Sequence, residues 1–494
     1  MPRVLPGIFD AYENMKRLYI LNGNTEVIEA NVFNPVRNLD WLIIKNNRLK
    51  SIEKNAFAGL TGLNVLNLNN NNLTVLNKDM FSSLVSLKYL SLKMNQISEI
   101  SDDCFVNLKV LGVVFLSDNN LSYISDNMFS ENAELRILWL QQNHIKSISD
   151  KFFINKPLLT DLLLDNNQLE TFNWMQAKKN VSLHHNKLTE LQPLGPLSTP
   201  HSDLSFNNLT YLPAKAFALS YDLQFLLLND NSLENIHEDS LVNLKKLKFL
   251  SLENNKIKQI SLGTFRDLIS LETLSLSGNK LENIETGLFT GLSNLLLLDL
   301  SRNQIVSMQV SSLYSLKLLR TFRLDNNLLN SFIVDNLVIH LKSLKEISLD
   351  NNKWNCDWLS TNMNILEKNK ISIIPGASLK TTNIHGIPCS DNKTVVNNVT
   401  VNSITNITDN NSKADQLKEN TIISPQIQAV QTNHIPQQQQ TSHHVQVNII
   451  TALVVIGFVI VVAVILKRYF WKRRIILRHI PSTETVATKF EFVE

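Results

Sequence analysis

Apolar residues recur in a fixed frame along most of the chain, and the frame is clearest in LNVLNLNNNNL, residues 63–73. It reads L-x-x-L-x-L-x-x-N-x-L at that place. The alternation around Leu66 and Leu68 predicts a short strand with one buried face. A strand this short cannot bury that face alone, so the pattern predicts that successive copies stack and share a core.

An asparagine marks the same place in fourteen frames: Asn47, Asn71, Asn95, Asn119, Asn143, Asn167, Asn186, Asn207, Asn231, Asn255, Asn279, Asn303, Asn327 and Asn352. Most steps are 24 residues, and the exceptions are 19, 21 and 25, the first two between Asn167 and Asn207. An earlier, degenerate frame has Gly23 in that place. Buried where the chain leaves the strand, each asparagine can bond the backbone of adjacent turns.

A second marker stands ten residues after the asparagine: Phe33, Phe57, Phe81, Phe105, Phe129, Phe153, Phe217, Phe265 and Phe289, with Leu241, Leu313 and Leu337 in three other frames. These side chains would fill the space behind the sheet. The frame and its two markers resemble the typical extracellular leucine-rich repeat over about residues 8–390. The resemblance implies an α/β solenoid, a horseshoe with a parallel β-sheet on its concave side and irregular turns on its convex side.

The repeats predict a solenoid over residues 1–352 that is irregular near 168–207. Pro193, Pro196 and Pro200 would fall in short convex connections there. We expect a local change in curvature, and harmless drift in loop length is the alternative.

The first residues contain no apolar segment typical of a signal peptide. Phe9 stands where the marker of a still earlier repeat would fall, so the sequence is expected to begin inside a repeat. Members of the resembled family start with a signal peptide and a cysteine-bearing cap. We therefore expect an incomplete N-terminus, with a divergent natural start as the alternative.

Residues 353–390 resemble the C-terminal cysteine cap of such proteins, through NKWNCDWL and IPCS. That cap begins C-x-C, but Trp358 occupies the second cysteine position here. The resemblance implies that Cys356 and Cys389 pair, which would close a loop of roughly 30 residues and contribute ~3 kcal/mol. Two unpaired thiols are the alternative. Cys104 is expected to be a buried, inert thiol.

Residues 391–447 are rich in Asn, Thr, Ser and Gln, which predicts a disordered stalk. The stalk and the repeats each carry four N-x-S/T acceptor sites, and the clustering predicts a glycosylated chain of the secretory pathway. The sites are Asn72, Asn120, Asn180, Asn208, Asn392, Asn398, Asn406 and Asn410.

Ile449–Leu466 is an uncharged apolar run whose helix would span about 27 Å, so residues 448–466 are predicted to cross a membrane. The tail that follows, residues 467–494, begins with a basic cluster, whereas the 20 residues before the run contain no Lys or Arg. The positive-inside rule then predicts a plasma-membrane protein with its C-terminus in the cytosol and its repeats outside. The tail is too short for a kinase or a Toll-type signalling domain.

Composition gives little sign of other chemistry. The 47 basic residues nearly balance the 44 acidic ones, which does not indicate a nucleic-acid partner. No nucleophile–base constellation or phosphate loop is present, so we expect neither an enzyme nor a cofactor. His184, His185 and His201 lack ligand-like spacing, and no metal site is predicted.

The concave face is the candidate binding site, because residues six and four before each asparagine point away from the core. Several of these are large and apolar: Trp41, Tyr89, Val113, Phe115, Ile137, Trp139, Leu163, Phe225, Leu227 and Phe249. Adjoining aromatic side chains favour an interface. Strand propensity with cross-strand packing is the structural explanation that competes with it. Later frames carry Asp299, Arg323, Glu346 and Ser348 instead.

Together these features predict a single-pass cell-surface protein that binds a ligand through its concave face. A protein ligand is favoured, with a glycan or a lipid as the alternatives. Adhesion, innate recognition and a co-receptor role are compatible with the resemblance, and the oligomeric state is open, a dimer included. One alternative is a tail-anchored scaffold with its repeats in the cytosol. Another is a structural protein of matrix or cuticle attachment.

Overall fold

The computed structural model describes residues 3–154, 156, 158–173, 180–192, 199–374 and 383–390. All belong to one compact unit, Met1–Thr394. The predicted stalk, membrane span and tail lie outside the described residues. Within the described residues, no helix combines the length and the apolar character that crossing a membrane requires.

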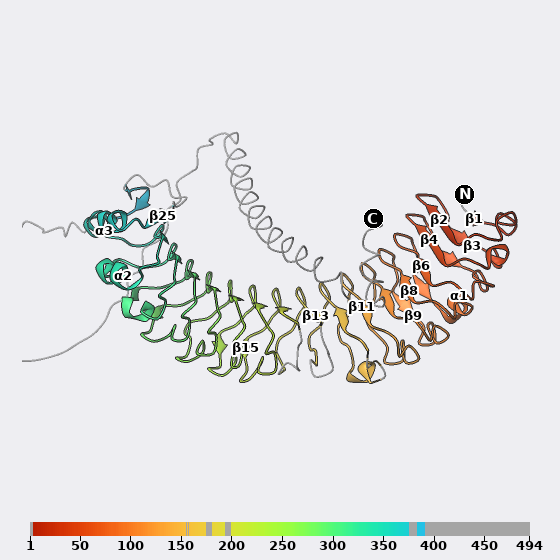
Figure 1. Ribbon diagram of the computed structural model, residues 1–494, viewed down its shortest axis with the longest axis horizontal. Coiled ribbons are helices and arrows are strands. Elements are labelled where there is room, and N and C mark those ends of the chain that lie inside the picture. Colours follow the sequence, from red (N-terminus) through yellow and green to blue (C-terminus); the bar gives the residue numbers. More distant parts are fainter. Residues whose placement is uncertain are drawn as a thin grey trace, which may run out of the picture. The chain divides into compact units, whose positions relative to one another are not determined.

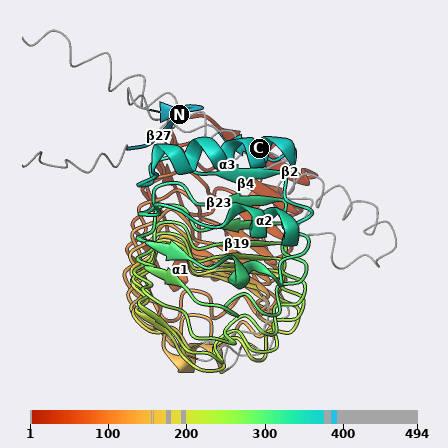
Figure 2. The ribbon, with the colours of Figure 1, turned by 90° about the vertical axis from the view of Figure 1, so that its left-hand side faces the viewer.

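Within this unit, short parallel strands follow one another along an arc and line its inner side, as the repeat predicts (Figure 1). Figure 2 looks along the stack from the α3 end and shows the turns overlaying one another. The first sheet contains β2 (Arg17–Leu21), β4 (Trp41–Lys45), β6 (Val65–Asn67), β8 (Tyr89–Ser91), β10 (Val113–Phe115), β11 (Ile137–Trp139), β12 (Asp161–Leu163) and β13 (Asn180–Ser182). The second contains β14 (His201–Asp203), β16 (Phe225–Leu227), β18 (Phe249–Ser251), β19 (Thr273–Ser275), β21 (Leu297–Asp299), β23 (Thr321–Arg323), β24 (Glu346–Ser348) and β25 (Ser372–Ile374).

The convex side consists of turns, short strand pairs and little helix, in agreement with the expected irregular turns. Its parallel strands are β1 (Arg3–Val4), β3 (Val27–Ile28), β5 (Ser51–Ile52), β7 (Val75–Leu76), β9 (Glu99–Ile100), β15 (Tyr211–Leu212), β17 (Asn235–Ile236), β20 (Asn283–Ile284) and β22 (Ser307–Met308). Its helical segments are η1 (Asn34–Val36), α1 (Lys78–Phe81), η2 (Asp150–Phe153), η4 (Val310–Leu313) and α2 (Val334–His340).

The marker asparagines form a continuous hydrogen-bonded ladder through the unit. Asn143 is typical: its Nδ2 donates to the carbonyls of Leu116 and Leu140 at 3.0 Å, and its Oδ1 accepts from the N–H of Leu121 at 3.0 Å. The amide thus satisfies backbone groups of its own turn and of the turn before. This confirms the predicted role of the asparagine, since an unpaired buried backbone group is costly.

The phenylalanine markers stack behind the sheet. Phe33, Phe57 and Phe81 have ring centroids 5.8 and 6.5 Å apart, and all three are buried. The prediction needs one correction, because the ring that contacts Phe129, at 6.3 Å, belongs to Phe152 rather than to Phe153. Both rings are buried, so the spacing alone could not choose between two adjacent phenylalanines.

The parallel sheet is interrupted between β13 and β14, within the stretch of short repeats. In other turns the residue just before the strand donates its N–H to the preceding turn, as Lys88 does to the Asn64 carbonyl at 3.0 Å. Pro200 occupies this place before β14 and has no N–H to donate. The N–H of the next residue, His201, is directed to Thr199 Oγ1 at 3.2 Å. Pro200 therefore directly precedes a concave strand and does not lie in a convex connection, which corrects the prediction from the sequence. Pro193 and Pro196 lie outside the described residues.

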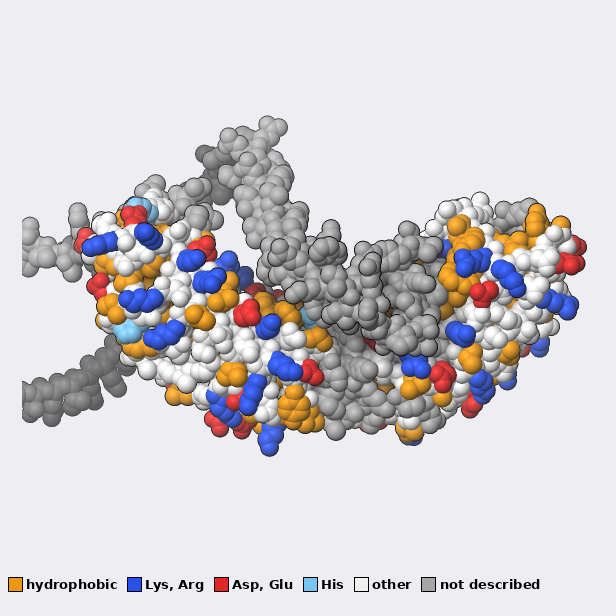
Figure 3. All heavy atoms as spheres, in the orientation of Figure 1, with side chains coloured by type: hydrophobic (Ala, Val, Ile, Leu, Met, Phe, Trp, Pro, Cys, Tyr) orange, Lys and Arg blue, Asp and Glu red, His pale blue; other side chains and the backbone are white. Residues whose placement is uncertain are grey.

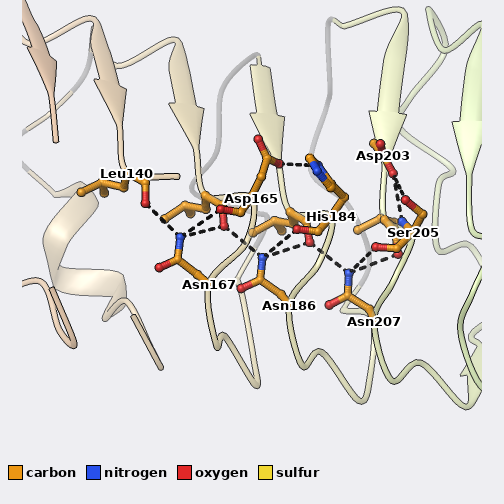
Figure 4. Close-up of polar contacts among 11 residues, drawn as sticks. Leu140, Asp165, Asn167, His184, Asn186, Asp203, Ser205 and Asn207 are labelled. Carbon is orange, nitrogen blue, oxygen red and sulfur yellow. Dashed lines mark hydrogen bonds and ion pairs between the residues drawn. The ribbon is translucent and has the colours of Figure 1, made fainter. Parts of the chain in front are cut away.

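The asparagine ladder crosses the interruption (Figure 4). Asn207 Nδ2 donates to the Leu183 carbonyl at 2.9 Å, and Asn207 Oδ1 accepts from the N–H of Leu188 at 3.0 Å. The two sheets are thus joined at the strand ends while their strands are unpaired.

The C-terminal end is closed by α3 (Cys356–Lys368) and the antiparallel pair β26 (Asn383–Ile384) and β27 (Ile387–Pro388). Asn355 caps α3, since its Oδ1 accepts from the N–H of Trp358 at 3.0 Å. A disulfide joins Cys356 to Cys389, with Cα atoms 5.1 Å apart.

Trp358, at the place of the expected second cysteine, packs in an aromatic cluster. Its ring stacks on Trp354 at 4.6 Å and lies 5.2 Å from Phe332, and its Nε1 donates to the Phe332 carbonyl at 3.2 Å. This cluster packs α3 against the last turns of the solenoid.

Candidate functional site

All ten predicted apolar positions lie in strands of the two sheets, on the face opposite the core. The strands alternate, so Leu90, Val114 and Leu138 belong to the hydrophobic core while their neighbours along the chain do not. Strand register places Val113 between Tyr89 and Ile137 on adjacent strands. The predicted positions therefore share one continuous face in each sheet.

Three rings form a contiguous aromatic stripe across the first sheet, comprising Tyr89, Phe115 and Trp139. Tyr89 meets Phe115 edge-on at 5.3 Å, and Phe115 stacks on Trp139 at 4.0 Å with the planes 14° apart. Such contacts add about 0.5–1.5 kcal/mol each beyond area burial. They fix the rings in place, which lowers the side-chain entropy that the rings would lose when a partner binds.

Exposure varies along this face. Tyr89 and Val113 are 6% and 9% exposed, less than the prediction of a solvent-facing patch requires. The other eight residues are half-buried. Phe115 and Trp139 therefore offer the accessible part of the aromatic stripe, while Tyr89 supports it from one side.

A second aromatic cluster begins the second sheet. His201 stacks on Phe225 at 4.4 Å with the planes 4° apart, and Phe225 lies 6.4 Å from Phe249. Partial burial lowers the pKa of His201, which favours the neutral ring. The pattern had identified Phe225 and Phe249 but not the contribution of His201, which lies at the equivalent place six residues before Asn207, because only large apolar side chains were selected there.

Trp41 stands apart from both clusters. The guanidinium carbon of Arg17 lies 4.7 Å from its ring centroid, a cation–π contact that joins β2 to β4. Leu163 and Leu227 are half-buried at the third positions of β12 and β16. Leu163 extends the aromatic stripe, because it lies in register with Trp139.

A polar pair lies between the aromatic stripe and the second cluster. His184 Nδ1 is 2.9 Å from Asp165 Oδ1 on the preceding turn (Figure 4). The contact with Asp165 raises the pKa of His184, partial burial opposes it, and the charges of Asp165 and Asp203 add to the rise. Asp203 Oδ1 is itself held by the backbone N–H and the hydroxyl of Ser205. The sequence analysis did not single out this pair, although Asp165 and His184 stand at the same place of successive frames, two residues before Asn167 and Asn186.

Further along the second sheet the face becomes polar, as predicted. Arg323 Nη1 lies 3.5 Å from Asp299 Oδ2, and the Ser348 hydroxyl donates to Asp325. No group of three or more potential metal-ligating side chains occurs in the described part of the chain.

Comparison with known proteins agrees with this geometry. The family model for leucine-rich repeats matches overlapping segments that together cover residues 13–169 and 203–329, more than half of the chain. The chain belongs to the leucine-rich repeat family. The unmatched residues between the two blocks contain the short repeats and the interruption of the sheet. A comparison with curated protein sequences found no match.

Solved leucine-rich repeat structures share the fold at low sequence identity. The structure of the Toll–Spatzle complex from Drosophila aligns with a TM-score of 0.62 and 20% identity, over 74% of this chain and 52% of that one. The LRIM1/APL1C complex aligns with a TM-score of 0.57 and 21% identity, over 78% of this chain and 65% of that one. A Leptospira interrogans protein aligns with a TM-score of 0.53 and 24% identity, over 73% and 95%. The chain thus spans about half the length of the Toll chain.

Three acceptor asparagines of the leucine-rich repeats share one place in the turn, directly after the ladder asparagine. Asn120 and Asn208 are exposed there and Asn72 is half-buried, on the flank where the strands end. Asn180 differs, because it is the first residue of β13 and its Nδ2 donates to Asp161 Oδ1 at 3.2 Å. The four stalk sites lie outside the described residues.

Cys104 is buried, and burial together with the charge of Asp103 raises the pKa of its thiol. Such a thiol is unreactive as a nucleophile. It packs in the core beside the phenylalanine markers, as expected from its position.

Proposed function

We propose that the protein is a single-pass cell-surface receptor whose leucine-rich repeats bind a protein ligand through the concave face. The aromatic stripe carries this proposal. Its rings are pre-positioned by one another, and Phe115 and Trp139 keep accessible surface on the concave sheet. Buried or rigid Trp and Tyr side chains are favoured anchors in protein interfaces.

Fold similarity supports a binding role. The Toll chain is seen in a complex with Spatzle and LRIM1 in a complex with APL1C, so both similar solenoids have protein partners. These likenesses fall below 25% identity and extend to the fold alone. Adhesion, innate recognition and a co-receptor role fit equally, and in each the activity is binding rather than catalysis.

The topology belongs to the same proposal. The acceptor sites in the repeats, the polar stalk over residues 391–447 and the apolar run before the basic tail support repeats outside the cell and a cytosolic C-terminus. Endoglycosidase treatment of the full-length chain, made in cells from its native transcript, should shift its mobility by several glycans. No shift would overturn this topology and favour the tail-anchored scaffold.

A ligand screen with matched variants tests the binding face. Proteins captured by the full-length wild type should be lost with Phe115→Ala and Trp139→Ala, by at least about tenfold for anchors of this kind. Tyr123→Ala and Tyr221→Ala are the controls, because these rings are exposed by 53% and 55% but lie outside the two concave sheets. Equal loss in both pairs would rule out the aromatic stripe as the site.

A further inference from the structure

Lysines form a row along one flank of the last three turns. Strand register aligns Thr321 with Glu346, and Glu346 with Ser372. Lys317, Lys342 and Lys368 each lie four residues before one of these aligned positions. The three lysines thus occupy the same place on consecutive turns, on the flank where the concave strands begin.

Three more cations extend this row into a basic flank, defined by Lys317, Arg320, Lys342, Lys345, Lys368 and Lys370. Arg320 and Lys345 directly precede β23 and β24, and Lys370 follows α3. All six side chains are exposed. Figure 3 shows Lys and Arg side chains gathered at the end of the solenoid that carries α2 and α3.

The basic flank is not neutralised by the protein's own carboxylates. Among the described residues, no carboxylate oxygen lies within 4.0 Å of any of its six cationic groups. Glu367, adjacent to Lys368, instead lies 3.7 Å from His385.

On some earlier turns, cations of the same flank are paired with carboxylates. Lys246 pairs with Asp222 at 2.7 Å, and Arg136 pairs with Glu134 at 3.3 Å. Lys109 likewise pairs with Glu131. Lys245 and Lys248, at the equivalent places before β18, are also without a carboxylate within 4.0 Å among the described residues, but the two turns after them carry no cation at these places. The six cations of the basic flank differ in lying on three consecutive turns, which concentrates positive potential there.

The arrangement fits a linear polyanion. Adjacent strands lie about 4.8 Å apart, so each row presents cations at close, regular intervals along the solenoid. Lysine ammonium groups are compact, hydrated point charges with three donors, suited to sulfate oxygens that need no bidentate geometry. Single-stranded nucleic acid would also call for stacking rings between the charges. The nearest rings, Tyr314 and His340, are stacked on each other at 3.7 Å.

We propose that the basic flank binds a sulfated polysaccharide chain of the glycosaminoglycan class. It is a second binding surface, separate from the concave face. Its test is independent of the test of the aromatic stripe. A polysaccharide on this flank would leave the concave sheet open to a protein ligand.

The opposite flank supplies a matched control. Lys256, Lys280 and Lys353 each follow a ladder asparagine, are exposed, and have no carboxylate within 4.0 Å among the described residues. The test compares the triple variant Lys317→Gln/Lys342→Gln/Lys368→Gln with Lys256→Gln/Lys280→Gln/Lys353→Gln. Both remove the same charge from the full-length chain, which is purified in neutral detergent.

Binding is measured on immobilised heparin at several salt concentrations, with hyaluronan as the unsulfated polymer and phosphatidylserine vesicles as a lipid surface. We expect the basic-flank triple to lose about tenfold or more in heparin affinity and to show a salt slope shallower by about three charges. The control triple should stay within about twofold of wild type, and hyaluronan should bind weakly.

Three outcomes would overturn the proposal. Equal losses in the two triples would make heparin binding a net-charge effect. Vesicle binding that exceeds heparin binding and is lost with the basic-flank triple would assign the flank to anionic lipid, aided by exposed Leu318 and Ile339. No wild-type binding near physiological salt would remove the site. Circular dichroism of each triple checks that the fold is kept.

Discussion

The ring of Phe206 lies face to face with the ring of His185, with centroids 4.1 Å and planes 6° apart. Both residues have a left-handed backbone, with φ values of 54° and 52°. Each directly precedes a ladder asparagine, and the same conformation recurs at this place throughout the described turns. The residues are Asn22, Asn46, Asn70, Met94, Asp118, Gln142, Asn166, His185, Phe206, Asp230, Asn254, Gly278, Arg302, Asn326 and Asn351. The reversal turns the chain out of the strand and directs the next amide inward.

The left-handed backbone at Met94 predicts that a substitution there would stabilise the protein. It is half exposed with φ of 56°, a conformation that costs most residues about 1–2 kcal/mol but that asparagine tolerates. Met94→Asn should therefore raise the free energy of unfolding by about 1 kcal/mol. Asn166→Met, at the equivalent place with φ of 56°, should lower it by a similar amount. Chemical denaturation of both variants checks the pair, and the idea fails if the two changes have the same sign.

The interruption of the sheet predicts that Asn207 couples the two halves of the solenoid. Asn207→Ala removes the ladder bonds to Leu183 and Leu188 at the point where β13 and β14 are unpaired. The two halves should then unfold in two separate transitions, as measured by hydrogen exchange and chemical denaturation. Asn143→Ala removes equivalent bonds inside a continuous sheet, at a cost of about 3 kcal/mol, and should keep a single transition. A single transition in Asn207→Ala would show that core packing suffices to couple the halves.

The repeat frame was enough to predict the stacked turns, the ladder and the phenylalanine stack, because each depends on identical residues at a fixed spacing. The left-handed backbone before each ladder asparagine was not predicted. Asparagine, aspartate and glycine predominate at that position, but Met94, Phe206 and Arg302 also occur there and make the preference hard to recognise. Pro200 was noted in the sequence. That it interrupts the sheet could not be predicted, because this depends on whether the N–H missing from proline would have paired with the preceding turn. The Asp165–His184 pair depends on the side-chain positions in a shortened repeat, and the repeat frame does not specify these positions.

The Asp165–His184 pair predicts a pH-dependent contribution to stability. Asp165 raises the pKa of His184, so the charged ring is favoured in the folded state. This contribution is fully present below the unfolded value near 6.5 and is lost as the pH rises through the higher folded pKa. Asp165→Asn should lower the unfolding midpoint at pH 5.5 more than at pH 8. His185→Gln, which removes an exposed neighbouring imidazole, should show no such difference. An unshifted imidazole titration of His184 by NMR would contradict the pair.

The buried Lys156 leads to the opposite prediction at alkaline pH, namely that the free energy of unfolding rises with pH. It is 3% exposed, its Nζ donates to the Phe152 carbonyl, and burial lowers its pKa to about 8 despite the opposing charge of Asp126. Between that value and the unfolded value near 10.5 the unfolded chain binds more protons, so stability rises with pH. The penalty of charging is complete below the folded pKa and amounts to about 3 kcal/mol.

Leucine occupies the equivalent core position in other turns, at Leu60, Leu84 and Leu108, each fully buried. Lys156→Leu should therefore raise the free energy of unfolding at pH 7, by up to about 3 kcal/mol, and abolish the rise between pH 8 and 10. Lys151→Leu, which removes an exposed lysine from the same turn, should leave both unchanged. Urea denaturation at pH 7, 8.5 and 10 measures the three chains. If Lys156→Leu keeps the wild-type dependence of stability on pH, another group titrates in that range. Charging Lys156 in the folded state would then carry no penalty.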